Sequence, residues 1–266
     1  MDSNDFARQL RRLVVKVSKR AGVGHIASSL SIVDIVAVLF AVYIQPDGAE
    51  EPRTRFVLSK GHAALALYGA LHLCGRLSRD DLNEYCADGS SLGVHPEHTV
   101  PGIDVSTGSL GQGLSLCAGS ALAAQVDHAS RRTFCLMSDA ELNEGSVWEA
   151  IMFAGHHRLS QLTAIIDLNG QQALGMTSNV LDLGSAEDVA AKMRLFGWSS
   201  VVVDGHDVAQ LTGALAPAGG DAPTMVIART VAGHGVSFME RQVAWHYLPL
   251  SDQQYYLALR DLAAMA

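Results

Sequence analysis

Two polar side chains stand shortly after apolar runs in the middle of the chain. Asp139 follows the run at residues 132–137, and Asn169 follows the run at residues 162–166. In an open parallel sheet, both side chains would lie at the carboxyl ends of neighbouring strands, where such folds bind ligands. One carboxylate, one amide and a nearby backbone carbonyl form a hard, oxygen-only site that leaves room for phosphate oxygens. The pattern therefore predicts a site at which Mg²⁺ or Ca²⁺ bridges the protein to a diphosphate.

Four histidines fall in glycine-rich loops of the sequence, namely His25, His62, His95 and His246. A neutral imidazole can donate a hydrogen bond to a phosphate or a sugar hydroxyl, and it can exchange a proton near pH 7. A single loop histidine is usually a surface or structural residue. Four of them exceed what packing requires, so we expect them to act together at a site for phosphate and hydroxyl groups.

A glycine-rich segment, Thr-Gly-Ser-Leu-Gly-Gln-Gly, occupies residues 107–113. Gly108 permits a close approach of the backbone to a ligand, although the plain alternative is a simple connection between two elements. The segment lacks the G-x-G-x-x-G pattern. The first strand is not followed by a glycine-rich turn with an acidic residue about 20 positions later. A dinucleotide-binding function is therefore not indicated.

Alternating helical and strand patterns must position these residues. Continuous apolar runs without alternation predict strands that are covered by helices on both faces. The expected strands are 55–58, 133–137, 162–167, 199–203 and 224–228, and the expected helices are 6–19, 61–74, 114–124, 146–157, 186–196 and 208–214. This order predicts an α/β fold with a doubly wound, mostly parallel sheet and helices on both faces.

Three further segments carry expectations of their own. Ser31, with Asp34 three residues later, resembles a helix start, because a serine side chain can cap free backbone N–H groups. The apolar run at residues 32–44 is interrupted by Asp34 and is too short to span a bilayer. We therefore expect a buried helix there and no membrane partner. Residues 89–113 are rich in glycine and predict a long structured loop with a functional role.

The bulk composition narrows the class of protein. A chain of 266 residues, 48% of them apolar, can bury one sizeable core, so a single domain spanning 1–266 is expected. A net charge of −8 argues against nucleic acid as the main partner. The four cysteines show no C-x-x-C pairing, and no signal peptide is evident. A cytoplasmic location is expected.

Several segments resemble those of transketolases, and together they cover nearly the whole chain. Residues 138–150, Ser-Asp-Ala-Glu-Leu-Asn-Glu-Gly-Ser-Val-Trp-Glu-Ala, resemble the thiamine diphosphate signature of that family, with Ser138 and Ala140 in place of glycines. Similar matches are Gly-His-Ile-Ala at 24–27, Ser-Lys-Gly-His at 59–62, Val-His-Pro-Glu at 94–97, the segment 107–113, and the late segment 235–246. Five matches in the right order are very hard to obtain by chance.

The resemblance implies a thiamine diphosphate site with a bound Mg²⁺ or Ca²⁺. It implies metal ligation by Asp139, Asn169 and the carbonyl of Gln171, with Ala140 offering its backbone N–H to a phosphate at a negative φ. The resemblance further implies that His62 and His246 contact the diphosphate and that His25 and His95 contact the donor sugar. It implies that Gly108, Ser109 and Leu110 contact the aminopyrimidine and that Glu141 contacts the cofactor. Glu144 and Glu149 would link two active sites.

The resemblance also implies a partner. In transketolases, a second domain carries the glutamate that activates the cofactor, the pocket for the pyrimidine and most residues that bind a sugar phosphate. The present sequence ends shortly after the last motif of the diphosphate-binding domain. We therefore expect the pyrimidine-binding domain on a second chain, as in a split transketolase, with an α2β2 assembly as the natural arrangement.

Three hypotheses for function follow from this resemblance. The first is a split transketolase that moves a two-carbon ketol unit from a ketose donor to an acceptor. The second keeps the cofactor but delivers the unit to a carrier-protein thiol, for example on an acyl carrier protein. The third is a non-catalytic scaffold subunit, which the retained Asp139, Asn169 and loop histidines disfavour.

Overall fold

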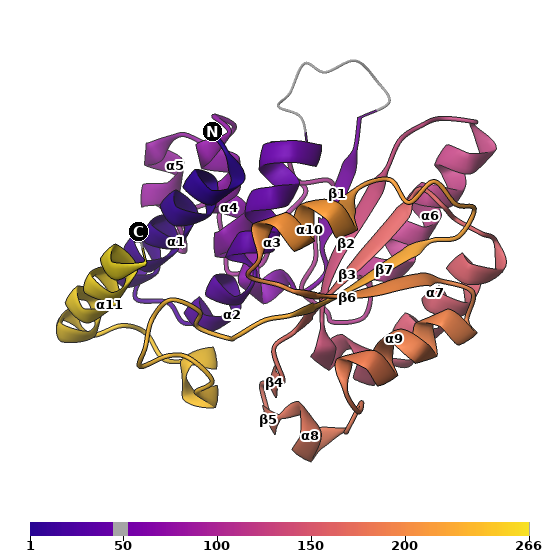
Figure 1. Ribbon diagram of the computed structural model, residues 1–266. Coiled ribbons are helices and arrows are strands. Elements are labelled where there is room, and N and C mark those ends of the chain that lie inside the picture. The colour runs from indigo at the N-terminus through magenta and orange to yellow at the C-terminus, as the bar shows by residue number, and fades with distance from the viewer. Residues whose placement is uncertain (45–52, 266) are drawn as a thin grey trace.

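A five-stranded parallel sheet forms the centre of the computed structural model, which describes residues 1–44 and 53–265 (Figure 1). The strand order is β1-β2-β3-β7-β6, and every neighbouring pair is parallel. The strands are β1 (Arg55–Leu58), β2 (Thr133–Ser138), β3 (Leu162–Leu168), β6 (Ser199–Asp204) and β7 (Thr224–Arg229). All five lie where the apolar runs predict them, so the expected α/β class is confirmed.

Burial of both sheet faces explains why the strands are continuous apolar runs. Successive strand residues point to opposite faces. Phe134 and Leu136 of β2 therefore join one buried cluster, whereas Cys135 and Met137 join the other. Since each face meets a layer of helices, neither face can tolerate polar side chains along its centre.

Helices cover the sheet on both sides (Figure 1). One buried cluster joins the sheet to α6 (Gly113–Val126), α7 (Gly145–His156) and α9 (Ala186–Leu195). The other joins it to α1 (Ser3–Ala21), α2 (Ile26–Ser31), α3 (Val33–Val38), α4 (Ala64–Leu73), α10 (Val208–Leu215) and α11 (Asp252–Ala264). The first and last helices, α1 and α11, pack side by side (Figure 1).

The expected helix start at Ser31 is wrong. Ser31 is the last residue of α2, and its hydroxyl donates to Asp167 on β3, 2.7 Å away, instead of capping a helix. The apolar run that follows is a buried helix as expected, and it continues from α3 into a π-helical turn at Leu39–Tyr43. A long-range hydrogen bond has therefore overridden a local capping pattern.

Several elements, most of them short, have no counterpart among the expected ones. They are α5 (Arg79–Asn83), α8 (Thr177–Val180), the two-stranded hairpin of β4 (Gln171–Gln172) and β5 (Gly175–Met176), and α11. The long loop is confirmed in that residues 89–112 contain no helix or strand. Over the residues that the structure describes, no helix is both long enough and apolar enough to cross a membrane.

Candidate active site

The loops at the carboxyl edge of the sheet enclose a cavity of about 180 Å³. Since β1, β2 and β3 are parallel neighbours, the segments that follow them all begin at this edge. The start of α2 and a late loop, which lies between β7 and α11 and carries His246, complete the walls. The lining residues are His25, Ala27, Ser28, Lys60, His62, Gly108, Leu110, Ser138, Ala140, Asn169, Gln171, Gln172, Ala173, Ala232 and His246.

Three of the four loop histidines form a triangle in this cavity. The ring centroids of His25, His62 and His246 lie 5.0–5.4 Å apart. His25 adopts a left-handed backbone with φ of 59°, and its N–H donates to the carbonyl of His246 at 3.0 Å. The preceding Gly24 lies so close to the late loop that a Cβ there would stand 2.3 Å from the carbonyl oxygen of Tyr247. Glycine at this position therefore allows residues far apart in sequence to meet.

The fourth histidine, His95, is exposed and does not line the cavity. Its ring packs against Gly108, where a Cβ would lie 3.3 Å from the ring carbons. Its backbone carbonyl accepts a hydrogen bond from Tyr68 at 2.9 Å. Gly108 thus permits the contact between the loop after Thr107 and the loop that carries His95.

The environment keeps the clustered imidazoles neutral. Burial lowers the pKa of His62 well below its ordinary value, and the charge of Lys60 lowers it further. Burial and the neighbouring His25 and Lys60 lower the pKa of His246 to about 4. Burial, His95 and Lys60 lower the pKa of His25. Neutral imidazoles can each donate one hydrogen bond and accept another.

Asp139 begins a 3₁₀ turn directly after β2 and is fully buried. One carboxylate oxygen accepts from the backbone N–H of Gly170 at 3.0 Å and the hydroxyl of Thr177 at 2.9 Å, and the other accepts from Ala140 N–H at 2.9 Å. Burial, together with the nearby charge of Asp167, raises the pKa of Asp139 to about 7. A cation would relieve the cost of this buried negative charge.

Asn169 lies across from Asp139, after β3, and lines the cavity. Its amide nitrogen donates to Asp167 at 3.0 Å, and its side-chain oxygen accepts from the backbone N–H of Gln171 at 2.9 Å. Gln171 begins the β4 strand and also lines the cavity. Asn169 and Gln171 therefore line the cavity, whereas Asp139 is buried just behind it, between the lining residues Ser138 and Ala140.

Ala140 takes a helical backbone inside the 3₁₀ turn at Asp139–Asn143, and it is absent from the residues with positive φ. An alanine in place of the family glycine therefore carries no left-handed strain here. Leu110 lines the cavity together with Gly108, whereas the side chain of Ser109 is exposed. Contact through the backbone, as the resemblance implies for this loop, does not require the serine side chain to face inward.

Glu141 and Glu144, two of the three glutamates of the signature segment, lie in different surroundings. Glu141 is fully buried and does not line the cavity. Its carboxylate accepts from the hydroxyl of Ser59 and from the backbone N–H groups of Gly111 at 3.0 Å and Ser138 at 2.9 Å. It therefore ties together the loops around the cavity. Glu144 is exposed beside Gly111, outside the cavity.

A buried ion pair at the base of the cavity was not among the expected site residues. The ammonium of Lys60 donates to the carboxylate of Asp167, and both side chains are almost completely buried. Asp167 also accepts from the hydroxyls of Ser31 and Thr230. A signal was available, because Asp167 is a charged residue inside an apolar strand pattern and therefore needs a partner.

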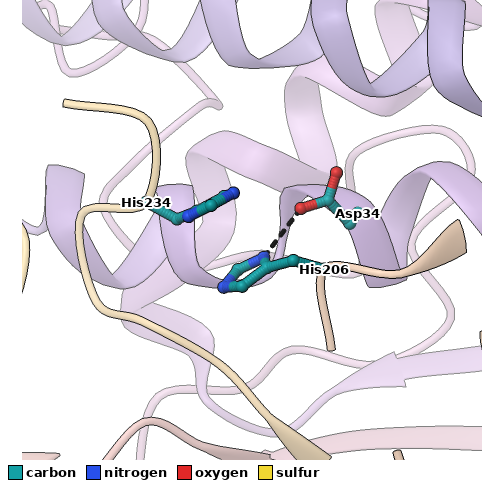
Figure 2. Close-up of side chains that lie close together, drawn as sticks. All are labelled: Asp34, His206 and His234. Carbon is teal, nitrogen blue, oxygen red and sulfur yellow. Dashed lines mark hydrogen bonds and ion pairs between the residues drawn. The ribbon is translucent and has the colours of Figure 1, made fainter. Parts of the chain in front are cut away.

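A second polar cluster, Asp34, His206 and His234, lies outside this cavity (Figure 2). His206 accepts from the N–H of Val231 through Nε2 at 2.9 Å, so its Nδ1 carries the proton that it shares with Asp34 at 2.8 Å. Arg11 donates to the same carboxylate oxygen of Asp34. The two imidazole rings stack 3.6 Å apart and nearly parallel. One nitrogen of each ring and one carboxylate oxygen of Asp34 lie within 4.8 Å of one another. The contacts with Arg11 and Val231 make this cluster a hydrogen-bonded network.

Comparison with known proteins agrees with the geometry. Residues 3–262 match the family described as transketolase, thiamine diphosphate binding domain. The 6-deoxy-6-sulfo-D-fructose transketolase subunit SqwG of a Clostridium species is 37% identical over 98% of this chain and 96% of its own length. One of the subunits of the apulose-4-phosphate transketolase of Phocaeicola vulgatus is 36% identical over 95% of this chain and 91% of its own length.

Solved structures give the same result. The transketolase of Campylobacter jejuni superposes with a TM-score of 0.91 at 28% identity, and the match covers 98% of this chain. It covers only 42% of that transketolase, so the present chain spans about two fifths of such longer relatives but nearly all of the two named subunits. This chain belongs to the transketolase family and corresponds to its thiamine diphosphate-binding domain.

Proposed function

We propose that this chain binds the diphosphate of thiamine diphosphate through Mg²⁺ or Ca²⁺ and serves as one subunit of a heteromeric transketolase. In this proposal, Asp139, Asn169 and the carbonyl of Gln171 hold the cation. The observation that carries it is one cavity lined by the histidine triangle, the loop at Gly108 and Asn169, with Asp139 buried between the lining residues Ser138 and Ala140.

The donor set fits the proposed cation. Carboxylate, amide and backbone oxygens are the ligands that Mg²⁺ and Ca²⁺ prefer, and the carboxylate of Asp139 is buried beside a second carboxylate. Buried polar atoms at the cavity also favour a polar ligand. Within the described residues, no hydrogen-bond partner is present for Nδ1 of His25, Oγ of Ser138 or the side-chain nitrogens of Gln171 and Gln172. Such atoms are costly unless a ligand or water satisfies them.

Each part of the cavity has a role in this proposal. Thiamine diphosphate, when bound, supplies an electron sink that allows a carbon–carbon bond beside a ketone to break. His62 and His246 would donate to the diphosphate, and His25 and His95 would donate to the carbonyl and hydroxyl groups of the donor sugar. Because the clustered imidazoles are neutral, they can hold or pass a proton without a full charge.

The proposal includes a partner chain that carries the pyrimidine-binding domain, with this chain as a single domain. Two relatives that this chain matches along nearly their whole length are named as subunits, which supports this arrangement. An α2β2 assembly would place two symmetric sites at interfaces, and the exposed Glu144 and Glu149 would lie between them. The names of these relatives give a sulfonated and a phosphorylated ketose, so anionic ketoses are the first donors to test.

The test is calorimetric titration of thiamine diphosphate with Mg²⁺ into this chain alone and into the complex with its co-expressed partner. We expect tight binding only in the complex. The variant Asp139→Asn should lose at least tenfold in affinity, because it removes the charged metal ligand. The control Asp127→Asn changes an exposed acid near the end of α6 and should bind like the wild type.

Failure of binding in both samples would overturn the proposal and leave the scaffold hypothesis. If binding is found, anionic ketoses and acyl-carrier thiols can be compared as substrates of the complex. Turnover with a sugar acceptor supports the split transketolase, whereas turnover only with a carrier thiol supports the biosynthetic alternative.

A further inference from the structure

Lys60 occupies an unusual place in the cavity. Its side chain is 1% exposed, yet it lines the cavity together with the three clustered histidines. A buried ammonium is costly unless it is paired, and Lys60 is paired with Asp167, which is fully buried beneath it. Its Nζ also approaches the carbonyl oxygen of Ser28 at 3.5 Å. These contacts fix the position of one positive charge at the base of the cavity.

The hydrogen bonds of Asp167 explain how this charge is held. The carboxylate accepts from Lys60 and from the hydroxyls of Ser31 and Thr230, which come from α2 and from the end of β7. It also accepts from the amide of Asn169 at 3.0 Å. With every oxygen occupied, Asp167 stays in place, and Lys60 is anchored to a rigid support.

The triangle of imidazoles stands next to this fixed charge. The ring centroids of His25, His62 and His246 lie 5.0–5.4 Å from one another, so two protonated rings would repel each other strongly. The groups that face the triangle are Lys60, the imidazole of His95 and the ring of Tyr247. No carboxylate acts on any of the three histidines within the described part of the chain. Lys60 is thus the fixed charge that acts on all three rings.

We propose that Lys60 is a positioning residue that sets the charge state of this cavity. Its ammonium, held by Asp167, adds to the burial that disfavours a charge on His25, His62 and His246. The cavity therefore presents one fixed cation and three neutral hydrogen-bonding rings instead of a variable number of charges. The proposal concerns the histidines themselves, and it depends on the proposed function only for the ligand to which they donate.

This assignment differs from a purely structural role. A structural ion pair would only stabilise the loops after β1 and β3. A charge-setting residue must also shift the titration of rings that it does not contact. Burial is the largest cause of the lowered pKa values of these histidines and Lys60 is a further one, so removal of its charge should raise those values only in part.

The test is an NMR titration of the histidine ring resonances in the full 266-residue chain without cofactor. The double variant Lys60→Met with Asp167→Asn removes both charges and avoids an unpaired buried carboxylate. We expect the titration midpoints of His25, His62 and His246 to move upward, from about 4 in the case of His246. Lys60→Arg keeps the charge and should keep the low midpoints.

A matched control is available in the second buried ion pair, Arg11 with Asp34. The double variant Arg11→Met with Asp34→Asn should leave the midpoints of the triangle unchanged, although it removes a pair of similar burial. If the first double variant does not fold, Lys60→Gln with Asp167→Asn replaces it, since the two amides can still form a hydrogen bond without either charge. Unchanged midpoints in a folded, uncharged variant would overturn the proposal, whether or not the cofactor binds.

Discussion

At the residue scale, the buried acids around the cavity are stabilised in two ways. Glu141 accepts two backbone N–H groups and one hydroxyl, so it holds loops in place. Asp167 is paired with Lys60, whereas Asp139 has hydrogen bonds but no cationic partner in contact among the described residues. Asp139 accepts the same kinds of donor as Glu141, but the nearby charge of Asp167 also acts on it, and its pKa is raised to about 7. A cation bound as proposed above would lower the cost of this charge.

His234 allows a test of pH dependence away from the cavity. Burial and the neighbouring His206 lower its pKa from 6.5 to about 4, with Arg11 also lowering it and Asp34 and Glu240 opposing. Between these two pH values the unfolded chain binds more protons, so stability rises with pH and is lost on acidification. We expect His234→Gln to reduce this acid-induced loss of unfolding free energy by about 1 kcal/mol, a figure lowered to allow for the partial exposure of the ring.

The measurement is urea denaturation of the wild type and His234→Gln at about pH 4.5 and pH 6.5, which cover most of the window between the two pKa values. The quantity of interest is the difference in unfolding free energy between the two pH values, because loss of the ring stacking is the same at both. His128→Asn, which removes an exposed imidazole, serves as the control. An equal pH dependence in His234→Gln and the wild type would contradict the interpretation.

At the scale of elements, glycines decide how closely neighbouring helices and loops can pack. Gly155 lies near the end of α7, and a Cβ there would stand 1.8 Å from the carbonyl oxygen of Phe196 beyond α9. Gly119 lies in α6, and a Cβ there would meet nothing within 4 Å. Both residues are helical, so they differ mainly in their tertiary surroundings.

Replacement of these two glycines should have opposite effects. Gly119→Ala should stabilise the chain by up to about 1 kcal/mol, because alanine is the better helix former. Gly155→Ala should destabilise it by about 2 kcal/mol or more, because α7 and the segment after α9 must move apart. Thermal or urea unfolding of both variants measures the difference. A stabilised Gly155→Ala would show that the close contact is not maintained in solution.

At the scale of the whole molecule, the parallel sheet determines where the chemistry lies. The buried clusters on its two faces are filled with apolar side chains, so polar ligands can be held only at an edge. The loops after β1, β2 and β3 meet at the carboxyl edge, and the late loop with His246 folds back onto them through Gly24. The packing of α1 against α11 joins the first and last helices on one side (Figure 1).

Metal removal tests the molecule as a whole. In the complex with its partner, addition of thiamine diphosphate with Mg²⁺ should raise the thermal unfolding midpoint. A ligand at about 100 times its dissociation constant adds about 2.7 kcal/mol to the free energy of unfolding. EDTA should return the midpoint to that of the unliganded complex. Scanning calorimetry with and without EDTA measures this, and a midpoint that keeps its increase in EDTA would indicate that the diphosphate binds without the cation.

The sequence by itself determined the strands, most long helices and the places of Asp139, Asn169 and the loop histidines, because apolar runs and glycine-rich loops are local patterns. Helix α11 was not among the expected helices, although Ser251 and Gln254 form a capping box at its start. Only the tertiary structure decided that the hydroxyl of Ser31 donates to Asp167 instead of capping a helix, and that Lys60 is buried against the same carboxylate. These contacts join residues more than 100 positions apart. No local pattern encodes which distant partner will neutralise a buried charge, because the packing of the whole sheet selects it.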